Sequence, residues 1–385
     1  MINREKIWLS SPHLGHTELN YIKEAFDGNW IAPLGPHVNG FEQALQVKTK
    51  SSNAAALSSG TAAIHMALIL LDVKAGDIIF CQSMTFSASA NPIAYQGAIP
   101  VFIDSEINTW NMDPSLLRKA LEEAKQKNKL PKAIIVVHLY GMPAKMNEII
   151  SIAIEFGVPV IEDAAEALGS NINGNPCGNF GTFGVLSFNG NKIITTSGGG
   201  ALLSHNREMI EKARYLSTQA RDIAPHYQHS QIGYNYRMSN ILAGIGRGQL
   251  EVLDDRVSAR RNNFERYKAF FTKYNNSGFN IQFQEEPTGY FSNRWLTCII
   301  LDSNKNNGLT REEIRLAMEL KNIETRPLWK PMHLQPVFAD SINYLNGISD
   351  NLFENGLCLP SGSNLTEEEF DRIFQCLKTL FLKYS

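Results

Sequence analysis

The chain has 385 residues, of which 43% are hydrophobic and 19% are charged. This length exceeds the size at which a single core usually stops growing, so we expect two domains. The 36 basic and 38 acidic residues give a formal net charge of −2, which argues against a nucleic-acid-binding protein because such proteins carry a basic face.

Cysteine content and hydropathy indicate a cytoplasmic protein. The five cysteines are odd in number and form no C-x-x-C pair, so we expect reduced thiols rather than disulfides or a zinc site. The N-terminal stretch lacks an apolar run long enough for a signal peptide, and no later run approaches the roughly 20 apolar residues of a membrane span. We therefore expect no metal, no membrane and no nucleic acid among its partners.

Residues 1–240 are predicted to form a large α/β domain that begins with a helical segment. Apolar residues recur at helical spacing over residues 17–27 and 36–48. Apolar β-rich runs then alternate with helical patterns, at residues 77–82, 101–104, 133–139, 158–163 and 183–188. A helix over residues 113–126 is expected to open on Asp113 as N-cap and Pro114 at its first position. This rhythm indicates a mostly parallel sheet with helices on both faces.

Residues 241–385 are predicted to form a connector helix and a smaller C-terminal α+β domain. Residues 240–272 are expected to be one long helix, because they are apolar early and heavily charged later. Strands are expected at residues 279–283 and 295–302, and helices at residues 310–321 and 366–383. The segment PTGYFSNR, residues 287–294, is the best candidate for a flexible loop.

Ligands of parallel α/β sheets gather at the carboxyl ends of the strands, and a possible anion site falls at such an end. In LSSGTAAIHMAL, residues 57–68, Gly60 and Thr61 open a helix, so its free amides and dipole would face a bound anion. A Ser-Gly-Thr sequence before a helix is also a common N-cap. This segment alone therefore does not identify a ligand.

Two further polar segments follow predicted strands. In VIEDAAEALGS, residues 160–170, Glu162, Asp163 and Glu166 have no nearby Lys or Arg in sequence, so something must compensate these carboxylates if they are buried. A helix N-terminus or a protonated heterocyclic nitrogen would do so. In SFNGNKIITTSGGG, residues 187–200, Lys192 is either a solvated loop residue or a Schiff-base nucleophile. An anion cradle, an isolated carboxylate and a lysine together match the needs of pyridoxal phosphate.

At these residues the chain resembles the sugar aminotransferases of the DegT/DnrJ/EryC1/StrS family. The resemblance extends from about Leu9 to Gly362 and rests on SSGTAAIHMAL, MTFSASANPI, HLYGMPAKM, IEDAAEALGS, SFNGNKIITTSGGGAL, GYNYRMSNILA and TRPLWKPMH. It implies the type I fold of pyridoxal-phosphate-dependent aminotransferases, with a mostly parallel sheet of the seven-stranded type, a smaller C-terminal α+β domain, and a homodimer. The likeness is strongest to enzymes that aminate C4 of a UDP-linked 4-keto-6-deoxy sugar on the way to UDP-N,N'-diacetylbacillosamine.

The resemblance also implies roles for particular residues. Lys192 would form the internal aldimine and move the proton between the amino acid's α carbon and the cofactor's C4', and Asp163 would pair with the pyridine nitrogen. The other implied cofactor contacts are phosphate ligands (Gly60, Thr61, Ser187), a residue stacked on the ring (Phe86), a neighbour of the phenolic oxygen (Glu166) and a phosphate contact from the other subunit (Asn235). Each site would then need the dimer.

The substrate contacts are less sharply defined. Arg326, Trp329 and His333 are proposed to line the sugar-nucleotide site. Arg237 is proposed to contact a phosphate or a substrate carboxylate from the neighbouring subunit, with Arg294 as a rival. Trp329 could equally be a packing residue. His138 and His65 are expected to be structural.

The chain differs from many relatives at two positions. Glu166 replaces a glutamine near the phenolic oxygen, where an ionised carboxylate would repel that oxygen, so we expect Glu166 to be protonated or separated from it by water. Gly199 stands where relatives often carry glutamate, which can mark a subgroup. Neither difference affects the lysine or the cofactor.

The expected reaction has two halves that share one site and give ping-pong kinetics. L-glutamate would leave its amino group on the cofactor, and a UDP-linked 4-keto-6-deoxy-N-acetylhexosamine would take it at C4. The alternatives are amination at C3 of a dTDP-sugar, a dehydratase on the same fold, and a sensor that binds the cofactor without turnover. Dehydratase relatives replace the lysine with histidine, and this chain has Lys192. The sensor is disfavoured because lysine, aspartate and phosphate loop are all present.

Overall fold

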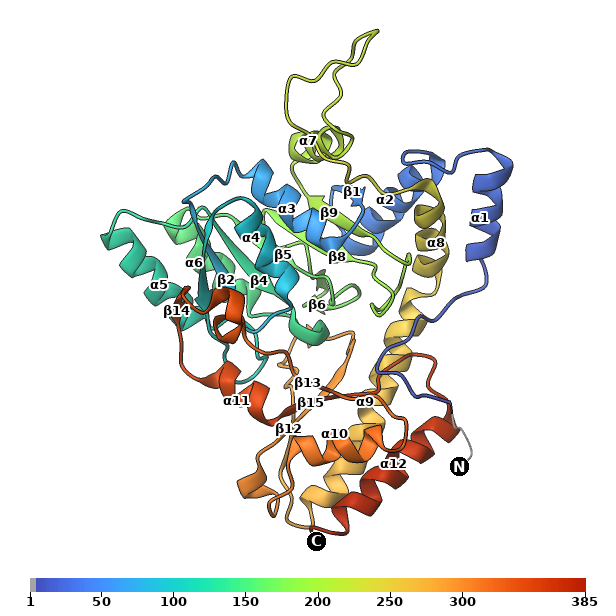
Figure 1. The fold of residues 1–385 in the computed structure, drawn as a ribbon, viewed down its shortest axis with the longest axis vertical. Coiled ribbons are helices and arrows are strands. Elements are labelled where there is room, and N and C mark those ends of the chain that lie inside the picture. Colours follow the sequence, from blue (N-terminus) through green and yellow to red (C-terminus); the bar gives the residue numbers. More distant parts are fainter. Residues whose placement is uncertain (1–4) are drawn as a thin grey trace.

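The computed structural model describes residues 5–385, which build an eight-stranded sheet above a smaller C-terminal antiparallel sheet (Figure 1). The large sheet has the order β1-β9-β8-β5-β4-β2-β3-β14. Its strands are β1 (Asn53–Leu57), β2 (Ile78–Gln82), β3 (Ile99–Ile103), β4 (Ala133–Val137), β5 (Val160–Asp163), β8 (Phe183–Ser187), β9 (Gly200–Ser204) and β14 (Ile342–Tyr344). Neighbouring strands are parallel except at β9, which runs antiparallel to β1 and β8. The predicted mostly parallel sheet is confirmed.

Five of the eight strands were identified from the sequence, and β1, β9 and β14 were not. The resemblance implied a sheet of the seven-stranded type, one strand fewer than the structure has. β1 and β9 pair over five residues each, but they are short runs of alanine, leucine and glycine that lack the β-branched residues typical of strands. β14 comes from the C-terminal half of the chain and pairs in parallel with β3. Its position at the edge depends on tertiary contacts alone.

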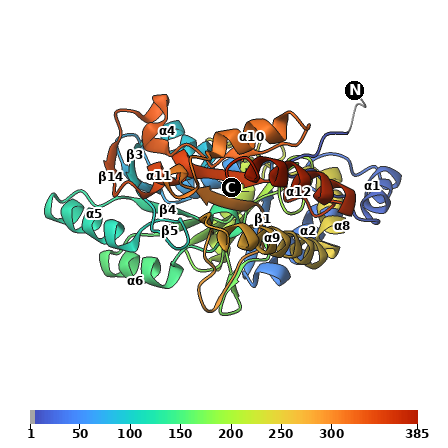
Figure 2. The same ribbon diagram turned by 90° about the horizontal axis from the view of Figure 1, so that it is seen from below.

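Helices cover both faces of this sheet, as the sequence predicts. One face carries α3 (Gly60–Leu70), α4 (Asn91–Tyr95) and α7 (Arg207–Ser217), and the other carries α2 (Pro36–Thr49), α5 (Pro114–Gln126), α6 (Met146–Phe156) and α8 (Asn240–Glu251). Successive residues of β4 separate the two cores, since Ile135 packs with α3 and Ile134 with α5 and α6. Figure 2 shows α4 and α6 on opposite sides of the sheet.

The C-terminal domain has a four-stranded antiparallel sheet of order β10-β12-β15-β13. Its strands are β10 (Ile281–Phe283), β12 (Thr297–Leu301), β13 (Arg326–Pro327) and β15 (Gly356–Leu359), packed with α9 (Leu253–Asn275), α10 (Arg311–Glu319) and α12 (Glu367–Phe381). Helices α10 and α12 begin with capping boxes at Thr310 and Thr366, which explains why their starts were readable from the sequence.

The expectation of one helix over residues 240–272 was wrong in one respect. Val252 has φ −106° and ψ 8° and separates α8 from α9. Glycines on α8 pack closely on the N-terminal segment, and a Cβ at Gly248 would lie 2.9 Å from the backbone nitrogen of Glu18, in α1 (Glu18–Asp27). The break lets α8 keep this contact while α9 runs to the C-terminal domain (Figure 1).

The segment 287–294 is not a loose loop, contrary to expectation. It contains β11 (Tyr290–Phe291), which pairs with β6 (Asn171–Ile172), and β6 in turn pairs with β7 (Asn175–Pro176). Asn293 is fully buried and donates to the carbonyl oxygens of Glu166, at 2.8 Å, and Leu168, at 2.9 Å. The polar side chain of Asn293 is therefore used for internal hydrogen bonds.

Two segments pack across the predicted boundary at residue 240. Ile7 is fully buried in the core of the C-terminal domain and bridges to Ile323. In the other direction, β14 joins the large sheet and is followed by α11 (Ile348–Asn355). The division into residues 1–240 and 241–385 stays a prediction.

Within residues 5–385, no helix has both the length and the apolar composition that crossing a bilayer requires.

Candidate active site

A cavity of about 670 Å³ opens at the carboxyl ends of the parallel strands, between the large sheet and the C-terminal domain. It is lined by most of the residues singled out in the sequence, namely Gly60, Thr61, Phe86, Asp163, Glu166, Ser187, Lys192, Arg326 and Trp329. They meet because strands that run in the same direction end at the same edge of the sheet.

The N-terminus of α3 forms one end of this cavity. Ser59 is the N-cap, and its hydroxyl accepts from the Ala62 amide at 3.0 Å, so the amides of Gly60 and Thr61 remain directed at the cavity. A Cβ at Gly60 would lie 3.0 Å from the Cβ of Ser187, and one at Gly200 would lie 2.3 Å from the carbonyl carbon of Ser59. The small residues thus allow β8 and β9 to close around a helix end that is suited to an anion.

Asp163 supplies a carboxylate with no ion-pair partner among residues 5–385. It ends β5, is 5% exposed, and accepts from Ser89 Oγ at 2.6 Å and from the Ala165 amide at 3.2 Å. Both are neutral donors, so the charge of the carboxylate is not balanced by a cation. A protonated ring nitrogen in the cavity would balance it.

Lys192 and Glu166 face each other across the cavity floor. Lys192 Nζ lies 3.1 Å from Glu166 Oε1, and the Tyr140 amide donates to Glu166 Oε2 at 2.8 Å. Burial raises the pKa of the Glu166 carboxyl to about 7, although the nearby Lys192 charge and the Tyr140 amide oppose the shift. This carboxyl therefore exchanges its proton near neutral pH.

Aromatic side chains form another wall of the cavity. Phe86 is 55% exposed, and its ring centroid lies 5.6 Å from that of Trp329. Trp329 packs on Tyr140 at 4.9 Å. The sequence interpretation missed Trp295, which is 2% exposed and carries Lys192 Nζ 4.3 Å from its ring centroid. Trp295 stands at the start of a strand-like run, which gave no sign of a role in the site.

Arg326 lies at the rim of the cavity. It pairs with Glu324, with Nη2 at 2.7 Å from Oε1, and its side chain is 67% exposed. A guanidinium in this position remains accessible to an anionic ligand entering the cavity.

Arg237 was expected to contact a phosphate or a substrate carboxylate from the neighbouring subunit, and within its own chain it belongs to a buried ion-pair group. Its side chain is 3% exposed, and Nη1 donates to Glu42 Oε1 at 2.6 Å and to the Ala56 carbonyl at 2.8 Å. Arg214 pairs with the other oxygen of Glu42. Removing either arginine from this buried group would leave Glu42 undercompensated, so Arg237 has a structural role in its own chain. Its contact with the neighbouring subunit stays a prediction.

His333 was also expected at the substrate site, and the structure corrects this. One ring nitrogen lies 2.6 Å from Ser83 Oγ and the other 2.8 Å from Asp350 Oδ1. The side chain is buried and does not line the cavity. Both nitrogens are occupied by the protein, so His333 fastens the segment that leads from Trp329 back to the large sheet.

Two other residues are placed outside the cavity of their own chain. Asn235 is exposed and forms a bridge with Thr218, the residue after α7. The chain that follows α7 projects as a loop at the top of Figure 1. The contact of Asn235 with a partner's cofactor stays a prediction. Arg294 is buried against Glu286, at 3.5 Å, and over the ring of Phe264, so it is a poor candidate for a carboxylate ligand.

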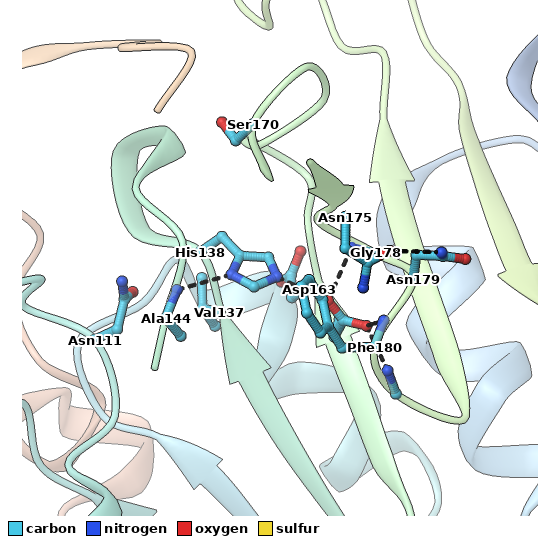
Figure 3. Close-up of polar contacts among 12 residues, drawn as sticks. Asn111, Val137, His138, Ala144, Asp163, Ser170, Asn175, Gly178, Asn179 and Phe180 are labelled. Atoms are coloured by element: carbon cyan, nitrogen blue, oxygen red, sulfur yellow. Dashed lines mark hydrogen bonds and ion pairs between the residues drawn. The ribbon is translucent and has the colours of Figure 1, made fainter. Parts of the chain in front are cut away.

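His138 and Glu162 form a structural group beside the site (Figure 3). Glu162 accepts from three backbone amides, those of Gly178, Phe180 and Gly181, at 2.5–2.8 Å, and from His138 Nε2 at 3.0 Å. The Ala144 amide donates to His138 Nδ1 at 3.0 Å, which places the proton on Nε2. These donors compensate the buried carboxylate of Glu162, so His138 is structural, as expected.

His65 also has structural contacts. It lies on α3, 7% exposed, and its ring nitrogens contact Tyr236 Oη at 3.1 Å and Gln96 Nε2 at 2.6 Å.

The donor set of the cavity fits pyridoxal phosphate. The free amides at Gly60 and Thr61 suit a phosphate, the unpaired carboxylate of Asp163 suits a protonated ring nitrogen, and the Lys192 amine suits an aldehyde. Residues 5–385 contain no group of three or more His, Cys, Asp or Glu side chains arranged to hold a metal ion.

The chain is similar to known aminotransferases over nearly all its length. The sequence model of the DegT/DnrJ/EryC1/StrS aminotransferase family matches residues 12–378. EpsN of Bacillus subtilis (strain 168), whose name assigns it provisionally as a pyridoxal phosphate-dependent aminotransferase, is 55% identical over 381 residues, which cover 98% of this chain and 96% of EpsN. GDP-perosamine synthase of Escherichia coli O157:H7 is 35% identical, with coverage of 96% and 97%.

A solved structure supports the same relationship. Spr1654 of Streptococcus pneumoniae, described provisionally as a sugar aminotransferase and solved in its PLP form, superposes with a TM-score of 0.87 and 26% identity. The superposition covers 99% of this chain and 100% of Spr1654.

Proposed function

This chain belongs to the DegT/DnrJ/EryC1/StrS aminotransferase family and is a pyridoxal-phosphate-dependent sugar aminotransferase that acts on a nucleotide-linked keto sugar, and we propose that it moves the amino group of L-glutamate to C4 of a UDP-linked 4-keto-6-deoxy-N-acetylhexosamine. The product would be a UDP-4-amino-4,6-dideoxy-GlcNAc for bacillosamine-type glycan synthesis. The observation that carries the proposed chemistry is the cavity in which Lys192, Asp163 and the N-terminus of α3 come together.

Pyridoxal phosphate, when bound, supplies an aldehyde and an electron-accepting ring. The amides of Gly60 and Thr61 and the hydroxyls of Thr61 and Ser187, all at the cavity wall, would hold its phosphate. Asp163, held in place by Ser89 and Ala165, keeps the proton on the ring nitrogen.

Lys192 has two tasks in the proposed reaction. Its Nζ would hold the aldehyde end of the cofactor, and as a free amine it would take the proton from the α carbon of glutamate. Glu166 Oε1, 3.1 Å from Nζ, holds or releases a proton as Nζ changes charge. With the pKa of Glu166 raised to about 7, this exchange requires little energy near neutral pH.

The aromatic wall and the rim are suited to the sugar nucleotide. Phe86 would cover one face of the cofactor ring, while Trp329 offers a flat apolar surface to the sugar. Arg326 at the rim would meet an anionic part of the substrate.

We also propose a cytoplasmic homodimer with shared sites. The cysteines of residues 5–385 are all free, which is usual in a reducing compartment. Apolar side chains are exposed near the N-terminal helices, including Leu19 at 76%, Phe26 at 59% and Trp30 at 53%, and such a group is typical of an interface. Asn235 would reach the phosphate of the partner's cofactor. Light scattering of the purified protein tests the dimer.

The substrate is tested by incubating the purified protein with glutamate and a panel of UDP-, dTDP- and GDP-linked 3-keto and 4-keto sugars. The GDP sugars are included because of the 35% identity to a GDP-perosamine synthase. Mass spectrometry and NMR would identify the aminated carbon. Exclusive amination at C3 of the dTDP sugar would favour that alternative, and bleaching of the yellow protein by glutamate would argue against a binding-only sensor.

A further inference from the structure

The peptide that precedes Lys192 is fastened from outside its own loop. The carbonyl oxygen of Asn191 accepts two hydrogen bonds, one from Trp295 Nε1 at 2.7 Å and one from Ser10 Oγ at 2.7 Å. Asn191, Ser10 and Trp295 all line the cavity. The backbone carrying Lys192 is therefore held by the N-terminal segment and by the residue that leads into β12.

Trp295 contacts both the peptide that precedes Lys192 and the amine at the end of the Lys192 side chain. Its indole N–H holds the preceding carbonyl, and its ring face lies 4.3 Å from Lys192 Nζ. The ring thus attracts the amine when it is charged, while Glu166 contacts Nζ at 3.1 Å. Nζ is held between a carboxyl of the large domain and an indole of the C-terminal domain.

A buried arginine fixes both donors. Arg260 on α9 is 1% exposed and donates to the Trp295 carbonyl at 2.5 Å and to Ser10 Oγ at 2.9 Å. Because the guanidinium has no acceptor, Ser10 Oγ must accept from it and is left to donate to Asn191. Arg260 forms no ion pair with any carboxylate among residues 5–385, and burial lowers its pKa to about 9. The buried guanidinium of Arg260 therefore donates to neutral acceptors, the Trp295 carbonyl and Ser10 Oγ.

We propose that Trp295 is a positioning residue for Lys192: it sets the place of the reacting amine from the C-terminal domain, with Ser10 as a second donor and Arg260 as their common support. The inference rests on the proposed role of Lys192. An amine that must leave one carbon and remove a proton from another depends strongly on its position, because misplacement by about 1 Å can reduce rates about 100-fold.

The test measures separately how fast Lys192 forms its covalent link to the cofactor and how tightly the cavity binds a cofactor analogue. Cofactor-free Trp295→Phe keeps an aromatic ring under Nζ and loses only the N–H donor. With added pyridoxal phosphate, stopped-flow absorbance should show the covalent link to Lys192 forming about tenfold more slowly than in the wild type, the effect expected for one lost hydrogen bond. The affinity for 4-deoxypyridoxine phosphate, which has no aldehyde, should change less than twofold.

Further variants show whether a slower reaction of Trp295→Phe comes from the lost hydrogen bond or from a general defect in folding. Ser10→Ala removes the second donor with little change in packing, and the double variant should lose more than the product of the two single effects, since each donor supports the same carbonyl. Trp8→Phe is the matched control, because Lys6 Nζ lies 3.9 Å from the Trp8 ring but Trp8 has no link to Asn191. The Trp8→Phe variant should form the covalent link between Lys192 and the cofactor at the wild-type rate.

The outcomes distinguish this inference from the proposed function. Borohydride reduction and peptide mass spectrometry of the wild type locate the covalent link, and its absence at Lys192 would refute the proposed function itself. If the wild type forms the link and Trp295→Phe and Ser10→Ala form it equally fast, only the positioning role is refuted. A parallel loss of analogue affinity and bonding rate would also refute it, because a general structural defect would then explain both.

Discussion

Lys192 Nζ and Glu166 Oε1 lie 3.1 Å apart in a cavity that also contains the unpaired carboxylate of Asp163. The two side chains come from different strand ends, and only 12% of Lys192 and 3% of Glu166 is exposed. A covalently reacting amine next to a carboxyl that titrates near neutral pH is well suited to repeated proton transfer. The first predictions concern these groups.

Lys192→Ala should abolish turnover with glutamate and keto sugar, since no other amine of the described chain faces Asp163 in the cavity. The loss should exceed about 1000-fold, the scale of removing a covalent catalyst. Steady-state assays measure it, with circular dichroism and binding of 4-deoxypyridoxine phosphate as controls for the fold. Near-normal activity would contradict the assigned role.

Asp163→Asn should reduce the rate of the glutamate half-reaction by about 100- to 1000-fold, because a neutral amide cannot hold the proton on the ring nitrogen. This corresponds to the several kcal/mol expected when one partner of a buried charge pair is removed. Single-turnover absorbance measures the rate. Covalent attachment of the cofactor at Lys192 should persist, and its loss would indicate that Asp163 acts on folding instead.

Glu166→Gln should change how stability depends on pH. The pKa of Glu166 is about 7 in the folded chain against an ordinary 4.5. Between these values the unfolded carboxyl is ionised while the folded one keeps its proton, so raising the pH favours unfolding, and the penalty is complete above about pH 7. From pH 5 to 8 the cofactor-free wild type should lose up to about 3 kcal/mol relative to Glu166→Gln.

Urea denaturation at each pH measures this difference, and Glu208→Gln, an exposed change on α7, should follow the wild type. A wild type that gains stability over this range relative to the Gln variant would contradict the sign. In the loaded enzyme, Glu166→Gln should also shift the absorbance titration of the bound cofactor. An unchanged titration would mean that the carboxyl does not sense the cofactor.

Arg326→Ala should raise KM for the nucleotide sugar about five- to tenfold, as expected for the loss of a charged contact at an exposed rim. The glutamate half-reaction should keep its rate, because this half needs no nucleotide. Arg315→Ala is the matched control: Arg315 also pairs with glutamates but does not line the cavity. Equal effects of both variants would remove the case for a specific contact.

Gly200→Ala should destabilise the cofactor-free protein by about 1–3 kcal/mol, the range for overpacking. Its Cβ would lie 2.3 Å from the carbonyl carbon of Ser59, so β9 would have to move away from the helix end that is proposed to bind the phosphate. Thermal unfolding measures this. At Gly198 a Cβ meets nothing within 4 Å, and Gly198→Ala should leave stability unchanged. Similar losses at both positions would point to backbone entropy rather than contact.

Local patterns in the sequence determined much of the fold. Strands β2, β3, β4, β5 and β8 were recognised because each is a continuous apolar run. Helices α5, α10 and α12 are capped by Asp113, Thr310 and Thr366 through contacts within three residues, so their starts are encoded locally. Strands β1, β9 and β14 lacked such patterns. Their placement follows from pairing with residues far away in the chain, which a local pattern does not record.

The same distinction applies to the site. The sequence by itself determined the chemical groups, since Lys192, Asp163 and the Gly60–Thr61 turn lie in motifs whose backbone setting is local. Only the tertiary structure decided which groups are free: Arg237 is held by Glu42, His333 by Ser83 and Asp350, and Trp295 joins the site through Asn191. These partners are 17 to 250 residues apart in sequence, and folding brings them together because each buried polar group requires a partner.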